Sequence, residues 1–188
     1  MATNSEAQRS DKISLEVVTP KGRALKVEVD EVTAPSVEGE FGVLPGHLPL
    51  LAALHTGIVS YRVGGETKRC AVGQGFAEAG PDKVTILTDR YIEREQIDPV
   101  LVRKDLGEIQ QKLGQAEANN TGPTQENAEL ALLIREENWL AAELELYGDP
   151  PPATMRPFET FGPTPSPDDS DVPTDETPGD GGVGGASA

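Results

Sequence analysis

Few side chains in this chain are suited to covalent chemistry. Cys70 and scattered serines are the candidate nucleophiles, and His47 and His55 are the candidate general bases. The signatures Gly-x-Ser-x-Gly, Cys-x-x-Cys and His-Glu-x-x-His do not occur. Cys70 lies in a β-prone run, where a cysteine usually acts as a small buried hydrophobe. We therefore expect no catalytic residue, and we keep a hydrolase that pairs Cys70 with a histidine as an alternative.

Metal and phosphate sites lack their usual ligand patterns. His47 and His55 are eight residues apart, and neither belongs to a zinc-binding pattern. A single cysteine excludes an internal disulfide and a Cys-rich zinc site. The run Gly73-Gln74-Gly75 lacks the spacing and the Lys-Ser/Thr pair of a phosphate-binding loop, so it reads as a turn. The sequence predicts neither a metal nor a cofactor.

Residues 37–51 combine three glycines and two prolines with large apolar residues. Proline fixes φ and glycine permits positive φ, so this stretch is expected to form a shaped turn rather than a helix or a long strand. Glu40 and His47 are the polar groups that it could present. Two roles remain open for His47, a contact with a partner or a hydrogen bond that stabilises the turn.

Residues 13–88 must position this turn, and they read as short strands. Apolar and polar residues alternate from Ile13 to Val17 and again from Leu25 to Val29. A period of two indicates strands with one buried and one solvated face. Further β-prone runs at 58–63, 67–72 and 84–87 are separated by glycine-rich turns. The pattern predicts an antiparallel β-sandwich, or flattened barrel.

Two helices are expected after the strands. Asp98 and Pro99 form a favourable N-cap and first helical residue. The first helix has one apolar stripe: Val102, Leu106, Ile109, Leu113, Ala116. A break at 119–123 precedes a second helix, capped by Thr124 and running to about Tyr147, that carries two neighbouring apolar stripes. One antiparallel neighbour covers about one stripe, so either the β-domain or another protein covers the second. A hairpin of this size should be able to move.

Charge and composition limit the partners. The 188 residues carry a net charge of -16, which argues against binding to nucleic acid or bare anionic lipid. Residues 148–188 are acidic and rich in proline and glycine, a composition typical of disorder. The predicted organisation is a flexible N-terminus at 1–12, a β-sandwich at 13–90, a helical hairpin at 91–147 and a disordered tail at 148–188. No long apolar run indicates a signal peptide or a membrane span.

The turn and the order of parts closely resemble the epsilon subunit of bacterial F-type ATP synthases. The family pattern is Gly-Glu-(aromatic or aliphatic)-Gly-x-x-Pro-Gly-His-x-Pro-Leu-Leu, and this chain reads Gly39-Glu40-Phe41-Gly42-Val43-Leu44-Pro45-Gly46-His47-Leu48-Pro49-Leu50-Leu51. Weaker matches are Leu54-His55-Thr56-Gly57, Gly73-Gln74-Gly75-Phe76, Val84-Thr85-Ile86-Leu87 with Asp89, and Ala128-Glu129-Leu130-Ala131. The resemblance covers residues 13–147.

The resemblance implies a non-catalytic rotor subunit of the central stalk. Such a subunit couples gamma to the c-ring for proton-driven ATP synthesis. Its hairpin can extend toward the alpha/beta head and restrain ATP hydrolysis. Glu40, Phe41 and His47 would form the surface that faces the c-ring. The protein would lie on the cytoplasmic face of the bacterial inner membrane, held there only through the complex.

Some family members bind ATP through Ile/Leu-Asp-x-x-Arg-Ala at the start of the first helix. Here Ile97 and Asp98 are kept, but Leu101 stands where the arginine is expected. Arg103 is two positions further on and would point elsewhere on the helix. Because the phosphate-pairing cation is missing, we expect weak or no ATP binding. A free-standing β-sandwich adaptor that holds a protein or peptide remains the alternative function.

Overall fold

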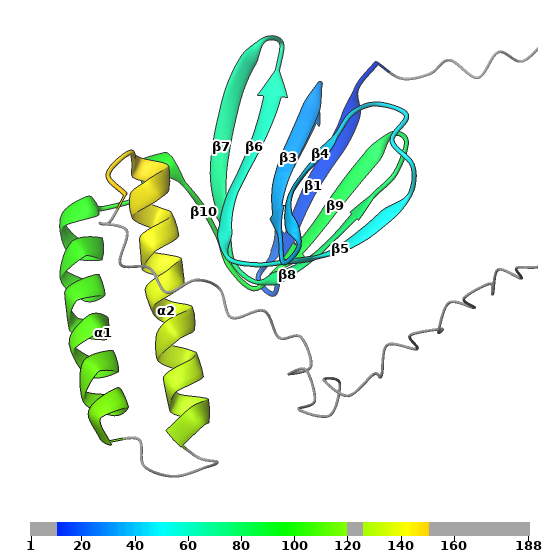
Figure 1. Cartoon of the computed structure of the whole chain (residues 1–188). Helices are drawn as coiled ribbons and strands as arrows, with labels where there is room; N and C mark the ends of the chain where they lie inside the picture. The colour runs from blue at the N-terminus through cyan, green and yellow to red at the C-terminus, as the bar shows by residue number, and fades with distance from the viewer. Residues whose placement is uncertain (1–10, 120–125, 151–188) are drawn as a thin grey trace, which may run out of the picture. The chain divides into compact units, whose positions relative to one another are not determined.

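The computed structural model describes residues 11–119 and 126–150 (Figure 1). Ten strands come first, then a short 3-10 helix and two α-helices. The strands are β1 (Ile13–Thr19), β2 (Gly22–Val29), β3 (Glu31–Ser36), β4 (Gly39–Val43), β5 (Leu50–Leu54), β6 (Gly57–Val63), β7 (Glu66–Val72), β8 (Gly75–Ala79), β9 (Lys83–Thr88) and β10 (Tyr91–Glu93). The helices are η1 (Arg94–Gln96), α1 (Pro99–Asn119) and α2 (Glu126–Tyr147).

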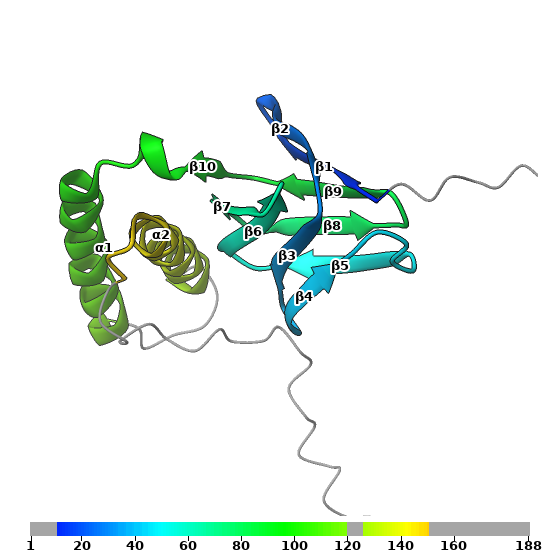
Figure 2. The same ribbon diagram turned by 90° about the horizontal axis from the view of Figure 1, so that it is seen from above.

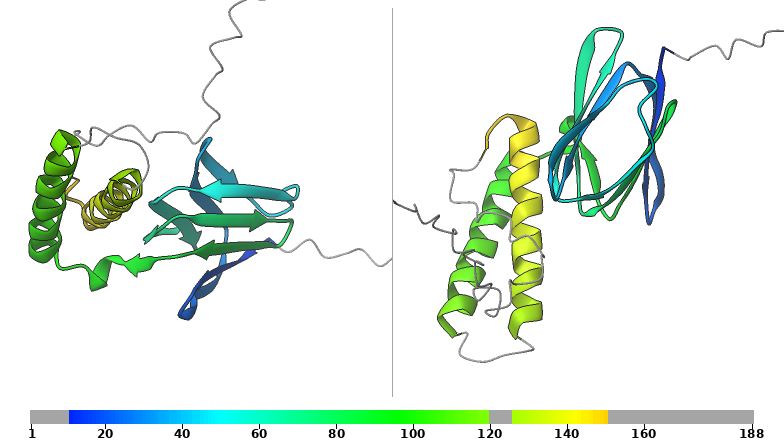
Figure 3. Two further views of the ribbon diagram at one scale, coloured as in Figure 1. Left: turned by 90° about the horizontal axis from the view of Figure 1, so that it is seen from below. Right: turned by 45° about the vertical axis from the view of Figure 1, so that its right-hand side comes forward.

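The strands form one strongly curved sheet whose two halves face each other, as Figures 2 and 3 show. The order is β10-β7-β6-β3-β5-β8-β9-β1-β2, and β4 pairs with β3 outside this path. The predicted sandwich followed by two helices is confirmed. One pairing differs from the antiparallel expectation, because β1 runs parallel to β9. The pairing joins the first strand of the chain to one of the last.

The core of the sandwich is aliphatic, as the alternating pattern predicts. On β1, Ile13, Leu15 and Val17 have no exposed surface, whereas Ser14 and Glu16 between them are half-buried. The same alternation recurs on β9, where Val84 and Ile86 point inward. Burying each such side chain contributes on the order of 1.5–3 kcal/mol, so this row is a main source of the sandwich's stability.

Local signals set the ends of the helices. The Asp98 carboxylate Oδ1 accepts the backbone N–H groups of Val100 at 3.0 Å and Leu101 at 3.3 Å, so Asp98 is the predicted N-cap of α1. At the end of α2, Gly148 takes φ +102° and Asp149 donates its N–H to the Leu144 carbonyl at 2.9 Å. This is the arrangement that glycine favours after a helix. The expected cap at Thr124, residues 1–10 and residues 151–188 lie outside the described residues.

The two helices bury the predicted stripe of α1, in which Val102, Leu106 and Leu113 are almost fully covered. On α2 both stripes are buried between Trp139 and Leu146, whereas Tyr147 at the end of the helix is 37% exposed and Leu132 in the N-terminal half is 65% exposed. The buried cluster around Trp139 includes Ile58 and Ala71 of the sandwich. The β-domain therefore covers part of the second stripe, which was one of the two alternatives.

Candidate partner-binding site

The stretch 37–51 contains strand β4 between a turn and a loop. Gly39 at φ +117° and Gly46 at φ +84° take backbone conformations that L-residues rarely adopt. Ser36 Oγ donates to the Gly39 carbonyl at 2.7 Å and closes the turn before β4. The glycines noted in the sequence therefore allow the chain to turn sharply before and after one short strand, β4.

His47 is tied into the loop that follows β4. Its backbone N–H donates to the Leu44 carbonyl at 3.0 Å, and its Nδ1 donates to the Leu48 carbonyl at 2.7 Å. The neighbouring Gly46 N–H donates to the Pro81 carbonyl at 2.7 Å, which fastens the loop to the turn between β8 and β9. The ring thus makes the turn-stabilising hydrogen bond that was one of its two expected roles.

Glu40 and Phe41 point to opposite faces of β4. Glu40 is exposed, whereas Phe41 is half-buried and packs against the sandwich core. Glu40 also lies at the start of β4 and His47 beyond its end, so the structure does not bring these two residues together. The exposed residues of β4 and the loop that follows it include Glu40, Gly42, Leu44 and Leu48, which are together called the β4 strip here. Leu48 is 80% exposed.

A second exposed surface lies on the outer face of the other half of the sheet. Phe76 of β8 and Leu87 of β9 are direct cross-strand partners and are 54% and 52% exposed. Leu87 also pairs with Val18 of β1, and Phe76 with Ala53 of β5. We call these four residues the outer row. The sequence reasoning missed it, although Leu87 directly follows the inward-facing Ile86 and so had to point outward.

The residues of the proposed nucleotide motif have structural roles. Ile97 is buried in the cluster between the helices and the sandwich, and the Asp98 carboxylate is used as the helix cap. Leu101 is more than half exposed and supplies no cation. Arg103 is turned to Asp149, with Nε donating to Oδ2 at 2.7 Å. No cation therefore stands at the position that the motif assigns to the phosphate partner.

Cys70 lies on β7 with no exposed surface. Burial raises the pKa of its thiol to about 12, so the protonated thiol is the form present near neutral pH. His47 and His55 each direct Nδ1 to a carbonyl oxygen of the following residue. These features disfavour a hydrolase that uses Cys70.

Within residues 11–119 and 126–150 there is no cluster of three or more potential metal ligands.

The comparisons with known proteins agree on one family. Residues 12–94 match the model for the ATP synthase delta/epsilon chain β-sandwich domain. The chain is 44% identical over 103 residues to an ATP synthase epsilon chain of Nitratidesulfovibrio vulgaris, covering 55% of this chain and 77% of that one. It is 49% identical over 92 residues to that of Syntrophobacter fumaroxidans, covering 48% of this chain and 68% of that one. This chain belongs to the family of ATP synthase epsilon chains.

A solved structure extends the likeness beyond the sandwich. A chain of the Euglena gracilis mitochondrial ATP synthase, in an assembly of OSCP, F1 and c-ring, superposes with a TM-score of 0.53 and 25% identity. The match covers 79% of this chain and 85% of that one. Among the described residues of this chain, no helix is long and apolar enough to cross a membrane.

Proposed function

We propose that this chain is the epsilon subunit of the central stalk, which couples gamma to the c-ring during proton-driven ATP synthesis. The observation that carries the proposal is the sandwich with two separate exposed surfaces, the outer row and the β4 strip. A subunit that joins two parts of a rotor needs two such surfaces. The subunit itself would not catalyse, and it would lie at the cytoplasmic face of the inner membrane through the complex.

The outer row is the proposed surface for gamma. Phe76 and Leu87 are adjacent, large and half-exposed, and aromatic and aliphatic anchors of this kind are enriched at protein interfaces. The row is flanked on β8 by the exposed Glu78 and on β1 by Glu16. An apolar centre with a charged rim supports a protein partner rather than a small ligand.

The β4 strip is the proposed surface for the c-ring. It offers one carboxylate, Glu40, and two exposed leucines, Leu44 and Leu48, along a strand and a fastened loop. The Glu40 carboxylate suits polar loops that carry basic and amide groups, which the family resemblance implies for the c-ring. Phe41 packs against the sandwich core, and His47 is held by its hydrogen bond to the Leu48 carbonyl in the loop, so both would keep the strip in shape.

The helical hairpin is the proposed brake on ATP hydrolysis. The hairpin contacts the sandwich through the buried cluster around Trp139, whereas Leu132 of α2 and Val100 of α1 are largely exposed. A brake needs two poses that differ by only a few kcal/mol, and a hairpin with exposed apolar side chains can gain contacts in a second pose. In the extended pose it would reach the alpha/beta head.

Co-purification tests the rotor role. Tagged full-length chain should recover gamma and the c-ring from detergent-solubilised membranes, and failure to recover gamma would leave the adaptor alternative.

The brake is tested by a truncation after Gln96, which keeps β10 paired with β7 while removing both helices. The truncated subunit should assemble normally and raise ATPase activity of the complex. Unchanged hydrolysis would remove the brake from the proposal but not the rotor role.

A further inference from the structure

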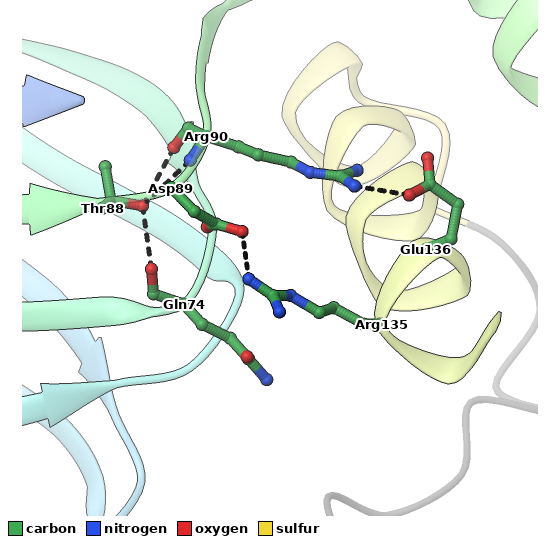
Figure 4. A network of polar contacts seen from close by, with 6 residues as sticks. All are labelled: Gln74, Thr88, Asp89, Arg90, Arg135 and Glu136. Carbon is green, nitrogen blue, oxygen red and sulfur yellow. Dashed lines mark hydrogen bonds and ion pairs between the residues drawn. The ribbon is translucent and has the colours of Figure 1, made fainter. Parts of the chain in front are cut away.

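The sandwich and α2 are joined by two adjacent ion pairs (Figure 4). Asp89, which follows β9, accepts a hydrogen bond from the guanidinium of Arg135. Arg90, the next residue, donates through Nη2 to Glu136 Oε2 at 2.6 Å. Two consecutive residues of the sandwich thus face two consecutive residues of the helix. We call these four residues the charge quartet.

The order of charges in the quartet specifies one register. The sandwich presents an acid and then a base at Asp89 and Arg90, and the helix presents a base and then an acid at Arg135 and Glu136. If the helix turned or slid so that the partners were exchanged, Arg135 would face Arg90 and Glu136 would face Asp89. Both contacts would then be repulsive, which is how charged pairs suppress incorrect docking.

The sandwich holds its half of the quartet in place. Thr88 Oγ1 lies 3.0 Å from the Arg90 carbonyl oxygen and 3.3 Å from the Gln74 carbonyl oxygen, and its single proton is shared between these two acceptors (Figure 4). The Arg90 guanidinium also lies 5.6 Å from the centre of the Trp139 ring. Asp89 Oδ1 is buried and has no hydrogen-bond partner among the described residues, and Arg135 is the cation that donates a hydrogen bond to the other oxygen, Oδ2.

Apolar contact between the two parts is limited. The sandwich contributes Ile58 and Ala71 to the buried cluster of the hairpin, with Ile92 of β10 packed against it. The large core of the sandwich is a separate cluster. The side chains of the quartet are between 30% and 39% exposed, so dissolved salt reaches them. Arg69 of β7 adds a further pair with Glu145, at 3.6 Å.

We propose that the charge quartet is a latch that selects one docked register of the hairpin and releases it as ionic strength rises. This inference rests on the proposed mobility of the hairpin, and it adds the residues that control that mobility. The latch works through charge order rather than through buried area. A rotor partner that offers competing charges to Arg135 or Glu136 would open the latch in the assembled enzyme.

The latch is tested in the isolated full-length chain by energy transfer between two labels. Lys68→Cys on β7 and Gln111→Cys on α1 are exposed labelling sites, and the native Cys70 is fully buried. Arg135→Glu places a second carboxylate against Asp89, and Glu136→Arg places a second cation against Arg90. Lys112→Glu is the matched control for Arg135→Glu, because it makes the same change of net charge at an exposed position of α1. The charge-exchanged double variant described below is the control for Glu136→Arg.

We expect energy transfer in the unsubstituted labelled chain to fall between about 20 mM and 500 mM salt, where the Debye length shrinks severalfold. Arg135→Glu and Glu136→Arg should each lower the docked-to-undocked ratio on the order of tenfold at low salt. Lys112→Glu should leave the docked-to-undocked ratio unchanged. Adding Arg90→Glu to Glu136→Arg restores the pair with its charges exchanged and should recover docking.

Two results would overturn the latch. One is equal docking in Arg135→Glu, Glu136→Arg and the Lys112→Glu control. The other is docking of the hairpin in the Arg90→Glu, Glu136→Arg double variant that is no better than in Glu136→Arg alone. Far-UV circular dichroism identifies any variant that loses its helices. If a single variant does so, recovery of docking in the Arg90→Glu, Glu136→Arg double variant decides whether the latch exists. Because these measurements need neither gamma nor a c-ring, failure of the latch is distinguishable from failure of the brake, which the truncation tests.

Discussion

Gly73 lies directly against the Asp89 carboxylate, since a Cβ at residue 73 would fall 2.0 Å from Asp89 Oδ1. A side chain at residue 73 is therefore compatible with the sandwich only if Asp89 moves. Movement of Asp89 would separate its Oδ2 from Arg135 of α2. The absence of a side chain at residue 73 thus leaves room for the Asp89 carboxylate in the position where it pairs with Arg135.

Gly73→Ala should loosen the hairpin while leaving the sandwich nearly intact, because the atom that must move is the end of a side chain. Gly75→Ala is the contrasting variant, since its Cβ would fall 1.9 Å from the Leu87 backbone carbonyl. We expect Gly75→Ala to cost about 3 kcal/mol of unfolding free energy and Gly73→Ala about 1 kcal/mol or less. Urea unfolding followed by circular dichroism, with fluorescence of the single tryptophan Trp139, separates the two effects. Equal losses of unfolding free energy in Gly73→Ala and Gly75→Ala would contradict the view that only the Asp89 side chain has to move for Gly73→Ala.

Glu143→Gln should stabilise the protein increasingly as pH rises. Glu143 is buried on α2, and desolvation raises the pKa of its carboxyl above 4.5, opposed by a hydrogen bond from Trp139. Glu136 and Asp105 raise the pKa further, and Arg90 lowers it. The folded state therefore binds this proton more tightly than the unfolded state, so the contribution of Glu143 to stability is greatest at acidic pH and is lost as pH rises from about 4.5.

The measurement compares melting temperatures of the parent chain and Glu143→Gln between pH 4 and pH 8, a range that begins below the ordinary pKa of a glutamate. The difference between the two proteins should widen toward pH 8, because glutamine has no charge to bury. Glu129→Gln, at an exposed position on the same helix, is the control and should show no such trend. A constant difference across this range would mean that Glu143 does not titrate as its surroundings imply.

ATP should bind weakly or not at all. Asp98 is occupied as the cap of α1, and Leu101 replaces the cation that would meet the phosphates. Titration calorimetry should detect no ATP affinity tighter than about 1 mM.

Asp98→Ala should lower the stability of α1 by about 1 kcal/mol, because the N-cap hydrogen bonds are lost, whereas Asp98→Asn should keep most of that stability. Binding of ATP at micromolar concentrations would mean that other residues supply the missing cation.

Phe76→Asp should weaken the proposed contact with gamma without unfolding the sandwich. Phe76 is about half exposed and points away from the core, so a charge at its position costs little in the isolated chain. At the centre of an interface the same charge would be desolvated and would lower recovery of gamma at least tenfold. Lys68→Asp, at an exposed position on β7, is the control. Undiminished recovery with an unchanged melting temperature would exclude the outer row as this surface.

Glu40→Lys and Leu48→Asp should weaken the proposed contact with the c-ring while leaving gamma bound. Both side chains are exposed on the β4 strip, and neither supports the core. We expect roughly a tenfold loss of c-ring affinity for each variant, measured by pull-down of detergent-solubilised c-ring. Glu66→Lys, at the exposed first residue of β7, provides the same charge change as Glu40→Lys elsewhere on the sandwich. If Glu66→Lys had an equal effect, the loss would reflect net charge rather than the β4 strip.

The sequence by itself determined the elements whose signals are local. Alternation predicted β1 and most of β2, Asp98 marked the start of α1, and the motif at residues 39–51 indicated the family. It did not predict β3, β4, β5, β8 or β10. Pro35 and the glycines of β4 and β8 are poor strand formers, and pairing with neighbouring strands overrides that preference. Three-residue β10 is too short for any periodicity to appear.

Only the tertiary structure decided which of the predicted residues work together. It separated Glu40 from His47, turned Phe41 inward and formed the outer row from four strands. It also brought Asp89 and Arg90 against Arg135 and Glu136, across 46 positions of the chain. Each of these relationships depends on how strands pair and how a helix docks. Such contacts join residues far apart in sequence, and no local pattern of residue types specifies them.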